Sequence, residues 1–285
     1  GLNSLILKTK KMAIYQVKNQ WGGSAAPWHA GGTFVLGARE NQNVVAIDIN
    51  SGDGGKTFSG TMTYDGEGPI GFKATQIVGN NYSVENQWGG SSAPWHPGGN
   101  WIIGGREGQN VVAVNAKANG LNLEGTMTYQ GEGPIGLDAT FVDGSSYSVE
   151  NQWGGNSAPW HEGGTFVLGA RKDQNPVDFD INSNDNGRTF SGTMTYKGEG
   201  PIGFRATQVS GNNYSVENQW GGSSAPWNPG GQMVIGARVN QNVVSLKISS
   251  KNDGIDFSGE MTYSGEGPIG VNAVISTSIN VTDNA

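Results

Sequence analysis

The chain has 285 residues, of which 48 are glycine and only 14% are charged, and its formal net charge is -7. An acidic chain in which Lys and Arg cluster only at residues 8–11 offers no basic patch for nucleic acid or an anionic membrane. The lack of cysteine excludes disulfides, thiolate chemistry and cysteine-based metal sites, and no apolar run approaches the roughly 20 residues of a membrane span.

One unit is repeated four times from residue 13 onward, whereas residues 1–11 lie outside the repeat. We expect the natural start at or near Met12 and interpret residues 1–11 as an N-terminal extension, either a leader or a cloning remnant. The repeat is marked by Trp-Gly-Gly, which begins at Trp21, Trp88, Trp153 and Trp220. Four equal repeats in a chain of this length favour two domains.

The first repeat predicts five short strands. Residues 14–20 form the first, which ends at Gly22 and Gly23, where the chain can take the positive φ of a sharp loop. Residues 33–39 alternate with a period of two and place Phe34 and Leu36 on the core face, so Arg39 is expected to point away from the core. Strands at 44–49, 57–64 and 70–78 complete the unit.

Two differences among the repeats carry structural information. The second repeat has Ala118-Asn119-Gly120 where the first has residues 51–55. Because Asn-Gly is a favoured two-residue turn, we expect a hairpin shortened by two residues, which preserves the side-chain parity of both strands. Pro176 replaces a valine of the other repeats, and we expect it at a strand start or a sheet edge because proline cannot donate a ladder hydrogen bond.

A unit of five strands has open edges, which two units could remove by closing into one antiparallel barrel of ten strands. The domains would then be a first barrel over residues 12–145 and a second over residues 146–285. A four-bladed propeller is the alternative, since a period near 66 residues is possible for a blade. Both architectures are all-β.

Each repeat offers an aromatic ring, a cation and an acid at fixed spacing. An Arg follows the first Trp by 18 residues, as Arg39, Arg106, Arg171 and Arg238, and a Glu lies in each Gly-Glu-Gly-Pro-Ile-Gly motif, as Glu67, Glu132, Glu199 and Glu266. An indole stacks against the C–H face of a pyranose, while Arg and Glu can hydrogen-bond to neighbouring hydroxyls. The set therefore predicts a sugar-binding site.

These residues also have structural interpretations. The second tryptophans, Trp28, Trp95, Trp160 and Trp227, follow a proline and could be packed at a corner, and the Arg and Glu residues could form surface salt bridges that contribute little stability. His29, His96 and His161 give way to Asn228 in the fourth repeat, and no metal-ligand spacing surrounds them. We interpret them as loop residues.

Catalysis has weaker support than binding. A glycosidase usually needs two carboxylates, but each repeat keeps one Glu at a constant place, and Asp48 and Asp65 of the first repeat become Asn115 and Gln130 in the second. No Ser-His-Asp arrangement is repeated. We therefore expect a protein that is not an enzyme. The alternatives are a structural or surface-adhesion repeat protein without a sugar site and, less favoured, a glycoside hydrolase.

The strings NQWGG, APW, GAR, QNVV and GTMTYxGEGPIG make the chain resemble the Oscillatoria agardhii agglutinin homologue lectin family over residues 13–275. The resemblance implies two tandem ten-stranded antiparallel β-barrels, each built from two five-stranded repeats. It also implies microbial origin, agglutination, binding to the branched mannose core of high-mannose N-glycans, and antiviral action. We expect no cofactor and no metal.

The resemblance further implies that each site is shared between paired repeats, so that the Trp-Gly-Gly loop of one repeat meets a Pro, Arg, Glu and Gly of the other. The implied sets are Trp21, Gly22 and Gly23 with Pro94, Arg106, Glu132 and Gly133; Trp88, Gly89 and Gly90 with Pro27, Arg39, Glu67 and Gly68; Trp153, Gly154 and Gly155 with Pro226, Arg238, Glu266 and Gly267; and Trp220, Gly221 and Gly222 with Pro159, Arg171, Glu199 and Gly200.

The expected partners are high-mannose oligosaccharides and mannose-rich glycoproteins such as viral envelope glycoproteins, with neither nucleic acid binding nor membrane insertion. Because the sequence shows no signal peptide, we expect a soluble protein that is cytoplasmic or released by a non-classical route. We also expect a monomer.

Overall fold

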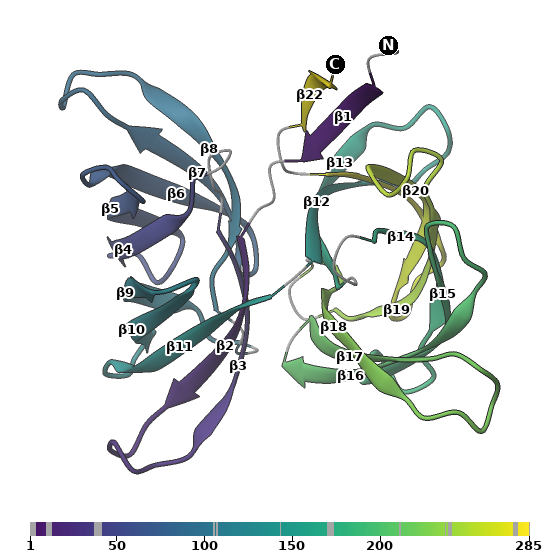
Figure 1. Cartoon of the computed structure of the whole chain (residues 1–285). Coiled ribbons are helices and arrows are strands. Elements are labelled where there is room, and N and C mark those ends of the chain that lie inside the picture. The colour runs from purple at the N-terminus through teal and green to yellow at the C-terminus, as the bar shows by residue number, and fades with distance from the viewer. Residues whose placement is uncertain are drawn as a thin grey trace.

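The computed structural model describes residues 4–9, 13–36, 42–104, 106, 108–142, 144–169, 174–210, 212–236, 238, 241–275 and 279–284. It contains two closed antiparallel barrels of ten strands each and a separate two-stranded sheet (Figure 1). The barrel interpretation is confirmed, and the propeller alternative is wrong. A search of this part of the chain for a helix long and apolar enough to cross a membrane finds none.

The ten strands of each barrel come from two repeats. The first barrel contains β2 (Ala13–Gln20), β3 (Trp28–Leu36), β4 (Val44–Asn50), β5 (Thr57–Tyr64), β6 (Ile70–Val78), β7 (Asn81–Gln87), β8 (Trp95–Ile102), β9 (Val111–Asn119), β10 (Asn122–Tyr129) and β11 (Ile135–Val142). The second contains β12 (Gly144–Gln152), β13 (Trp160–Gly169), β14 (Pro176–Asn182), β15 (Thr189–Tyr196), β16 (Ile202–Ser210), β17 (Asn213–Gln219), β18 (Asn228–Val234), β19 (Val243–Ser249), β20 (Asp256–Tyr263) and β21 (Ile269–Ile275). The expected count of five strands per repeat is confirmed.

Neither repeat of a pair closes a barrel by itself. In the first barrel, β2 of the first repeat pairs with β11 of the second, β4 pairs with β9, and β3 meets β8 at Val35 and Ile102. The chain-order neighbours β6 and β7 form the remaining seam between the repeats. Closure removes the strand edges that a single repeat would expose.

Each barrel interior is filled by its own cluster of large apolar side chains. The cluster of the first barrel contains Phe34 and Leu36, as the period-two pattern predicts. The opposite face of β3 is also buried. Val35 packs with Ile14, Ile102, Val167 and Val234 in a third cluster that joins the two barrels. Residues such as Val35 therefore point away from their own core but into the contact with the second barrel.

A buried asparagine ties the first strand of each repeat to a neighbouring strand. Asn19 donates from Nδ2 to Met127 Sδ at 3.1 Å and to the carbonyl of Gly136 at 3.2 Å. A Cβ on Gly31 would lie only 2.5 Å from Asn19 Oδ1, so this side chain also explains why glycine is needed on β3. Asn86, Asn151 and Asn218 donate to Met62, Met261 and Met194 in the same way.

Two local expectations can be compared with the backbone. Pro176 is the first residue of β14, as expected for a residue without an amide donor. The shortened hairpin exists, but Asn119 pairs with Asn122, so its central residues are Gly120 and Leu121 rather than Asn119 and Gly120. Gly120 has a φ of 65°, which explains why glycine is at the first central position.

The two-stranded sheet lies outside the barrels. It pairs β1 (Ser4–Thr9) with β22 (Ile279–Asn284), so segments from opposite ends of the chain lie side by side (Figure 1). The interpretation of residues 1–11 as a leader or cloning remnant stays a prediction.

We predict that Gly60→Ala lowers the free energy of unfolding by about 1–3 kcal/mol or more, because Gly60 has a φ of 147° and a Cβ would lie 2.1 Å from the carbonyl oxygen of Asp48. Gly52→Ala is the matched control, since its Cβ would meet open space, and it should change stability by less than about 0.5 kcal/mol. Urea denaturation measures both, and equal effects would contradict the prediction.

Candidate functional site

The Trp-Gly-Gly stretch forms the tip of the hairpin between β2 and β3. Gly22 and Gly23 have φ values of 94° and 103°, which favour glycine at both positions. The tip is held by Gln20, whose Nε2 donates to the carbonyls of Ser24 at 3.2 Å and Ala26 at 2.8 Å. Gln87, Gln152 and Gln219 hold the other three tips through the same pair of bonds.

The first tryptophan of each motif is exposed. Trp21, Trp88, Trp153 and Trp220 have exposed fractions of 46%, 45%, 46% and 48%. Side chains this accessible are not core residues. Their position at hairpin tips makes them available for stacking.

A cluster of Glu, Arg and Gln lies beside the first hairpin. Arg106 Nη1 donates to both carboxylate oxygens of Glu132, at 2.9 and 2.8 Å, and Gln109 Nε2 donates to Glu132 Oε2 at 2.8 Å. Arg106 Nη1 also donates to Gln109 Oε1 at 3.0 Å, and the guanidinium lies 4.1 Å from the centre of the buried Tyr129 ring. These contacts fix the orientation of an otherwise exposed carboxylate.

The same contacts lower the pKa of Glu132 below its ordinary value. The hydrogen bond from Arg106 is the largest cause, followed by the bond from Gln109, since both stabilise the charged form. The pKa of Glu266 is lowered by Arg238 and Gln241 in the same order. Each glutamate is therefore held as a carboxylate, which can only accept hydrogen bonds.

Strand register brings the hairpin and the cluster together across the repeats. Gln20 at the end of β2 pairs with Gly136 near the start of β11, which places the β2–β3 tip beside the loop that carries Glu132 and Gly133. The Arg106 guanidinium lies 5.5 Å from the centre of the Trp21 ring. The shared arrangement of Trp21, Arg106 and Glu132 is thus present in the structure.

The second barrel repeats this geometry. Gln152 pairs with Gly270, the Arg238 guanidinium lies 5.6 Å from the Trp153 ring, and Arg238 Nη1 bonds to Glu266 at 2.9 Å. The loop containing Glu266 and Gly267 consequently lies beside the Trp153 hairpin.

The other two sets are described without their arginines, because Arg39 and Arg171 lie outside the described residues. Gln87 pairs with Gly71 and Gln219 with Gly203, so the Trp88 and Trp220 hairpins adjoin the loops of Glu67 and Glu199. Glu67 accepts a bond from Gln42 Nε2 at 2.8 Å, and Glu199 accepts one from Gln174 at 2.6 Å.

The prolines lie differently from the implied sets. Pro94 belongs to the same hairpin as Trp88, and its neighbour Trp95 packs against Gly71, where a Cβ would lie 3.3 Å from the ring. Because Gly71 follows the loop of Glu67, Pro94 lies near that loop rather than near Trp21 and Glu132. By the equivalent contacts of Trp28, Trp160 and Trp227 with Gly136, Gly270 and Gly203, Pro27, Pro159 and Pro226 also stay with their own hairpins.

Two residue types near the sites were missed in the sequence. Gln42, Gln109, Gln174 and Gln241 all bond to the site glutamate, and their signal was the Gln-Asn pair that precedes a strand in every repeat. His29, His96 and His161 were interpreted only as loop residues, but they stack on Trp21, Trp88 and Trp153 with ring centres 4.2, 4.3 and 4.3 Å apart.

The second tryptophans differ within each barrel. Lys73 Nζ lies 4.3 Å from the centre of the Trp95 ring, and Arg205 lies 4.3 Å from that of Trp227. The positions equivalent to Lys73 beside Trp28 and Trp160 are Asp138 and Asn272, and these two rings keep exposed fractions of 41% and 39%. Trp95 and Trp227 are half-buried.

The chemistry of this arrangement suits recognition of a neutral polar ligand. An exposed indole supplies a flat apolar surface, the glutamate supplies two fixed acceptor atoms, and the arginine supplies donors. Among the described residues no group of three or more His, Cys, Asp and Glu side chains could hold a metal ion.

Comparison with known proteins gives a consistent result. Residues 13–77, 80–142, 145–209 and 212–276 each match the family model described as the OAA-family lectin sugar binding domain. The chain is 62% identical over 264 residues to myxobacterial hemagglutinin from Myxococcus xanthus, which covers 92% of this chain and 99% of that protein.

Two solved structures match at full length. The crystal structure of Burkholderia oklahomensis agglutinin is 60% identical with a TM-score of 0.91 and covers 94% of this chain and 97% of its own. The crystal structure of the Myxococcus xanthus hemagglutinin in complex with α3,α6-mannopentaose is 61% identical with a TM-score of 0.89, and covers 92% of this chain and 100% of its own.

We predict that Gln109→Leu raises the pKa of Glu132 toward the ordinary glutamate value, because it removes one of the two bonds that lower this pKa. A depressed pKa stabilises the fold above the pH at which an ordinary glutamate titrates, and this contribution is lost as pH falls through the folded pKa. NMR titration of the carboxyl carbons measures the shift. Glu266 in the same sample is the control, and an unmoved Glu132 would refute the role of Gln109.

We predict that Lys73→Ala lowers the free energy of unfolding by about 0.5–1 kcal/mol, because it removes the cation that lies over the half-buried Trp95 ring. Lys18 is the matched control, because it pairs with Asp138 where β2 meets β11, the strand pair equivalent to β7 and β6. Lys18→Ala should lower the free energy of unfolding by less than about 0.5 kcal/mol. Urea denaturation compares them, and a control effect as large as that of Lys73→Ala would argue against a specific contact with Trp95.

Proposed function

Because the chain belongs to the OAA-family lectins, we propose that it is a multivalent lectin that recognises the branched mannose core of high-mannose N-glycans through four sites without chemical turnover. The observation that carries the proposal is the exposed Trp21 ring beside a carboxylate held by Arg106 and Gln109, a combination that the Trp153 site repeats. The complex of the Myxococcus xanthus protein with α3,α6-mannopentaose supports mannose as the sugar.

The division of roles follows from the geometry. A pyranose ring would stack on the indole of Trp21, while its hydroxyls donate to the carboxylate of Glu132 and accept from the guanidinium of Arg106. Gly22 and Gly23 carry no Cβ, and the space that a Cβ would fill is open at Gly23 and meets only an ordinary contact at Gly22. A sugar can therefore approach the backbone amides of both residues closely. The prior fixing of Glu132 reduces the entropy lost when the sugar binds.

Four copies of such a site explain why modest single-site affinity is sufficient. When a branched glycan or a crowded surface engages several sites, the later binding steps become intramolecular and the overall avidity rises by about 10²–10⁴ over one site. We propose mannose-rich glycoproteins, including viral envelope glycoproteins, as targets for a chain that acts as a monomer, either in the cytoplasm or after non-classical release.

Calorimetric titration with α3,α6-mannopentaose tests the proposal. We expect near four sugars per chain for the wild type. Trp21→Ala or Glu132→Gln should reduce this number to near three, because each variant removes the stacking surface or one acceptor charge of a single site. At the altered site, loss of a charged hydrogen bond should weaken affinity by at least about tenfold.

Glu124→Gln is the matched control, since Glu124 is an exposed glutamate on β10 of the same barrel that belongs to none of the four sets. It should leave both stoichiometry and affinity unchanged. If the wild type gave no heat and Glu132→Gln only destabilised the fold, the protein would instead be a structural repeat protein. Release of free mannose over time would indicate a glycosidase.

A further inference from the structure

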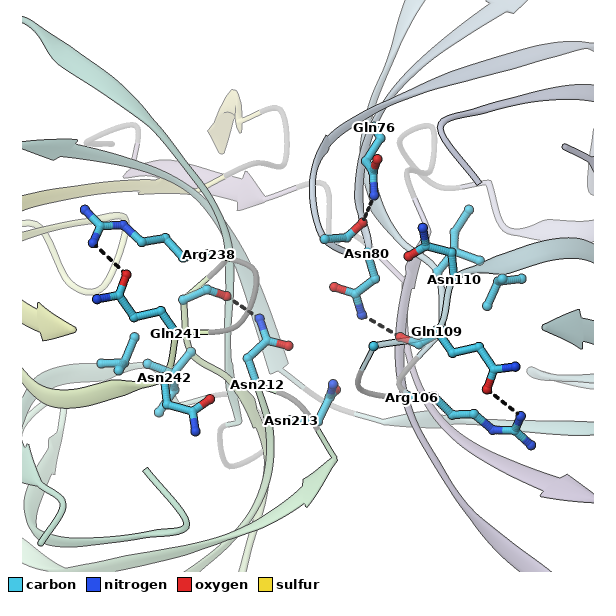
Figure 2. Close-up of a pocket in the computed structure, with 18 of the residues that line it drawn as sticks. Gln76, Asn80, Arg106, Gln109, Asn110, Asn212, Asn213, Arg238, Gln241 and Asn242 are labelled. Atoms are coloured by element: carbon cyan, nitrogen blue, oxygen red, sulfur yellow. Dashed lines mark hydrogen bonds between the residues drawn. The ribbon is translucent and has the colours of Figure 1, made fainter. Parts of the chain in front are cut away.

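A cleft of about 520 Å³ lies between the two barrels and borders the sites of Trp21 and Trp153 (Figure 2). Its walls come from equivalent segments of the two barrels, the β6–β7 turn and β8–β9 loop facing the β16–β17 turn and β18–β19 loop. Small-molecule sites in proteins typically have volumes of about 300–1,000 Å³, so this cleft can hold a ligand.

The walls are rich in carboxamides, in three equivalent pairs: Asn80 and Asn212, Asn110 and Asn242, and Gln109 and Gln241. The asparagine amides of the first two pairs donate inward to their own barrels, Asn80 to the Gly104 carbonyl at 2.5 Å, Asn212 to Gly236, Asn110 to Gly54 at 3.1 Å, and Asn242 to Asn186 at 3.0 Å. The Oδ1 atom of a carboxamide is an acceptor, the group that a ligand with hydroxyl groups can donate to.

One side chain on the cleft wall is buried without any hydrogen bond. Asn213 has an exposed fraction of 1%, and neither Nδ2 nor Oδ1 has a partner in the described part of the chain. Figure 2 shows this side chain directed toward the space between the barrels. A buried amide without partners costs free energy, and a ligand that both donates and accepts would remove that cost.

The charges of the cleft favour a neutral ligand. No carboxylate is among the described lining residues, and the two guanidiniums present would repel a metal ion. Arg106 and Arg238 are in turn neutralised by Glu132 and Glu266, at 2.8 and 2.9 Å, which removes the attraction for an anion.

Two of the carboxamides also belong to the sites already described. Gln109 lines the cleft and bonds to Glu132, and Gln241 lines it and bonds to Glu266. Arg106 and Arg238 also line the cleft and bond to the same two glutamates. The cleft is therefore contiguous with one site of each barrel.

We propose that the cleft between the barrels is a fifth carbohydrate-binding site, which takes a neutral sugar ring through the carboxamides of both barrels. That the sugar is an arm of a mannose oligosaccharide rests on the proposed function. The cleft differs from the four hairpin sites because its walls present carboxamides rather than an exposed tryptophan.

The experiment follows side-chain amide resonances of Asn80, Asn212 and Asn242 by NMR while α3,α6-mannopentaose is added. It uses the wild-type chain and a variant in which Trp21, Trp88, Trp153 and Trp220 are all changed to Ala, which disables the hairpin sites and leaves the cleft walls intact. We expect saturable shifts of the cleft amides in both proteins. When it is added to this fourfold variant, Asn213→Leu should reduce these shifts at least tenfold.

Asn81→Leu is the matched control. Asn81 occupies the equivalent position in the first barrel, pairing with Ile102 as Asn213 pairs with Val234, and is also buried without a partner, but it does not line the cleft. It should affect stability as Asn213→Leu does and leave the cleft shifts unchanged.

Three results would overturn the fifth site. The amide resonances of the cleft do not shift in the wild type, their shifts disappear when the four tryptophans are changed to Ala, or their shifts keep their size after Asn213→Leu. The proposed function fails separately, if calorimetry of the wild type gives no binding at the hairpin sites.

Discussion

The pairing of Gln20 with Gly136 is the contact on which the rest of the site depends. It aligns the end of the first strand of one repeat with the acidic loop of another, lets the Trp28 ring lie on Gly136, and brings Asn19 to the Gly136 carbonyl. A slip of one residue would move every side chain on the strand to the opposite face. Buried Asn19 opposes such a slip, because its amide would lose both the carbonyl and the sulfur of Met127.

Much of this fold could be predicted from the sequence because its signals are local. The period of two at Phe34 and Leu36 identified the core face, glycines marked the turns, and Ala118-Asn119-Gly120 in place of residues 51–55 located the shortened hairpin. The cross-repeat sets of Trp, Arg and Glu came from the family resemblance, since spacing within one repeat does not say which other repeat supplies its partner.

The features that sequence reasoning missed depend on contacts between distant segments. His29 stacks on Trp21 only because the hairpin brings the start of β3 back to the residue that follows β2, and Gln109 reaches Glu132 across 23 residues of chain. Val35 was assigned to a face pointing away from its own core, but no period reveals that another barrel covers it. The different surroundings of Trp28 and Trp95 were visible in the sequence as Asp138 and Lys73, once the strand pairing identified those positions as equivalent.

The seams between repeats also determine how such a chain can be shortened or duplicated. Without its fourth repeat, the chain would not keep three sites: the Trp153 hairpin would lack the loop of Glu266, and the loop of Glu199 would lack the Trp220 hairpin. Two whole sites and two halves would remain, together with strand edges left open by the missing partner. Valency in this architecture therefore increases in steps of two, and the smallest unit that can be inherited intact is a pair of repeats.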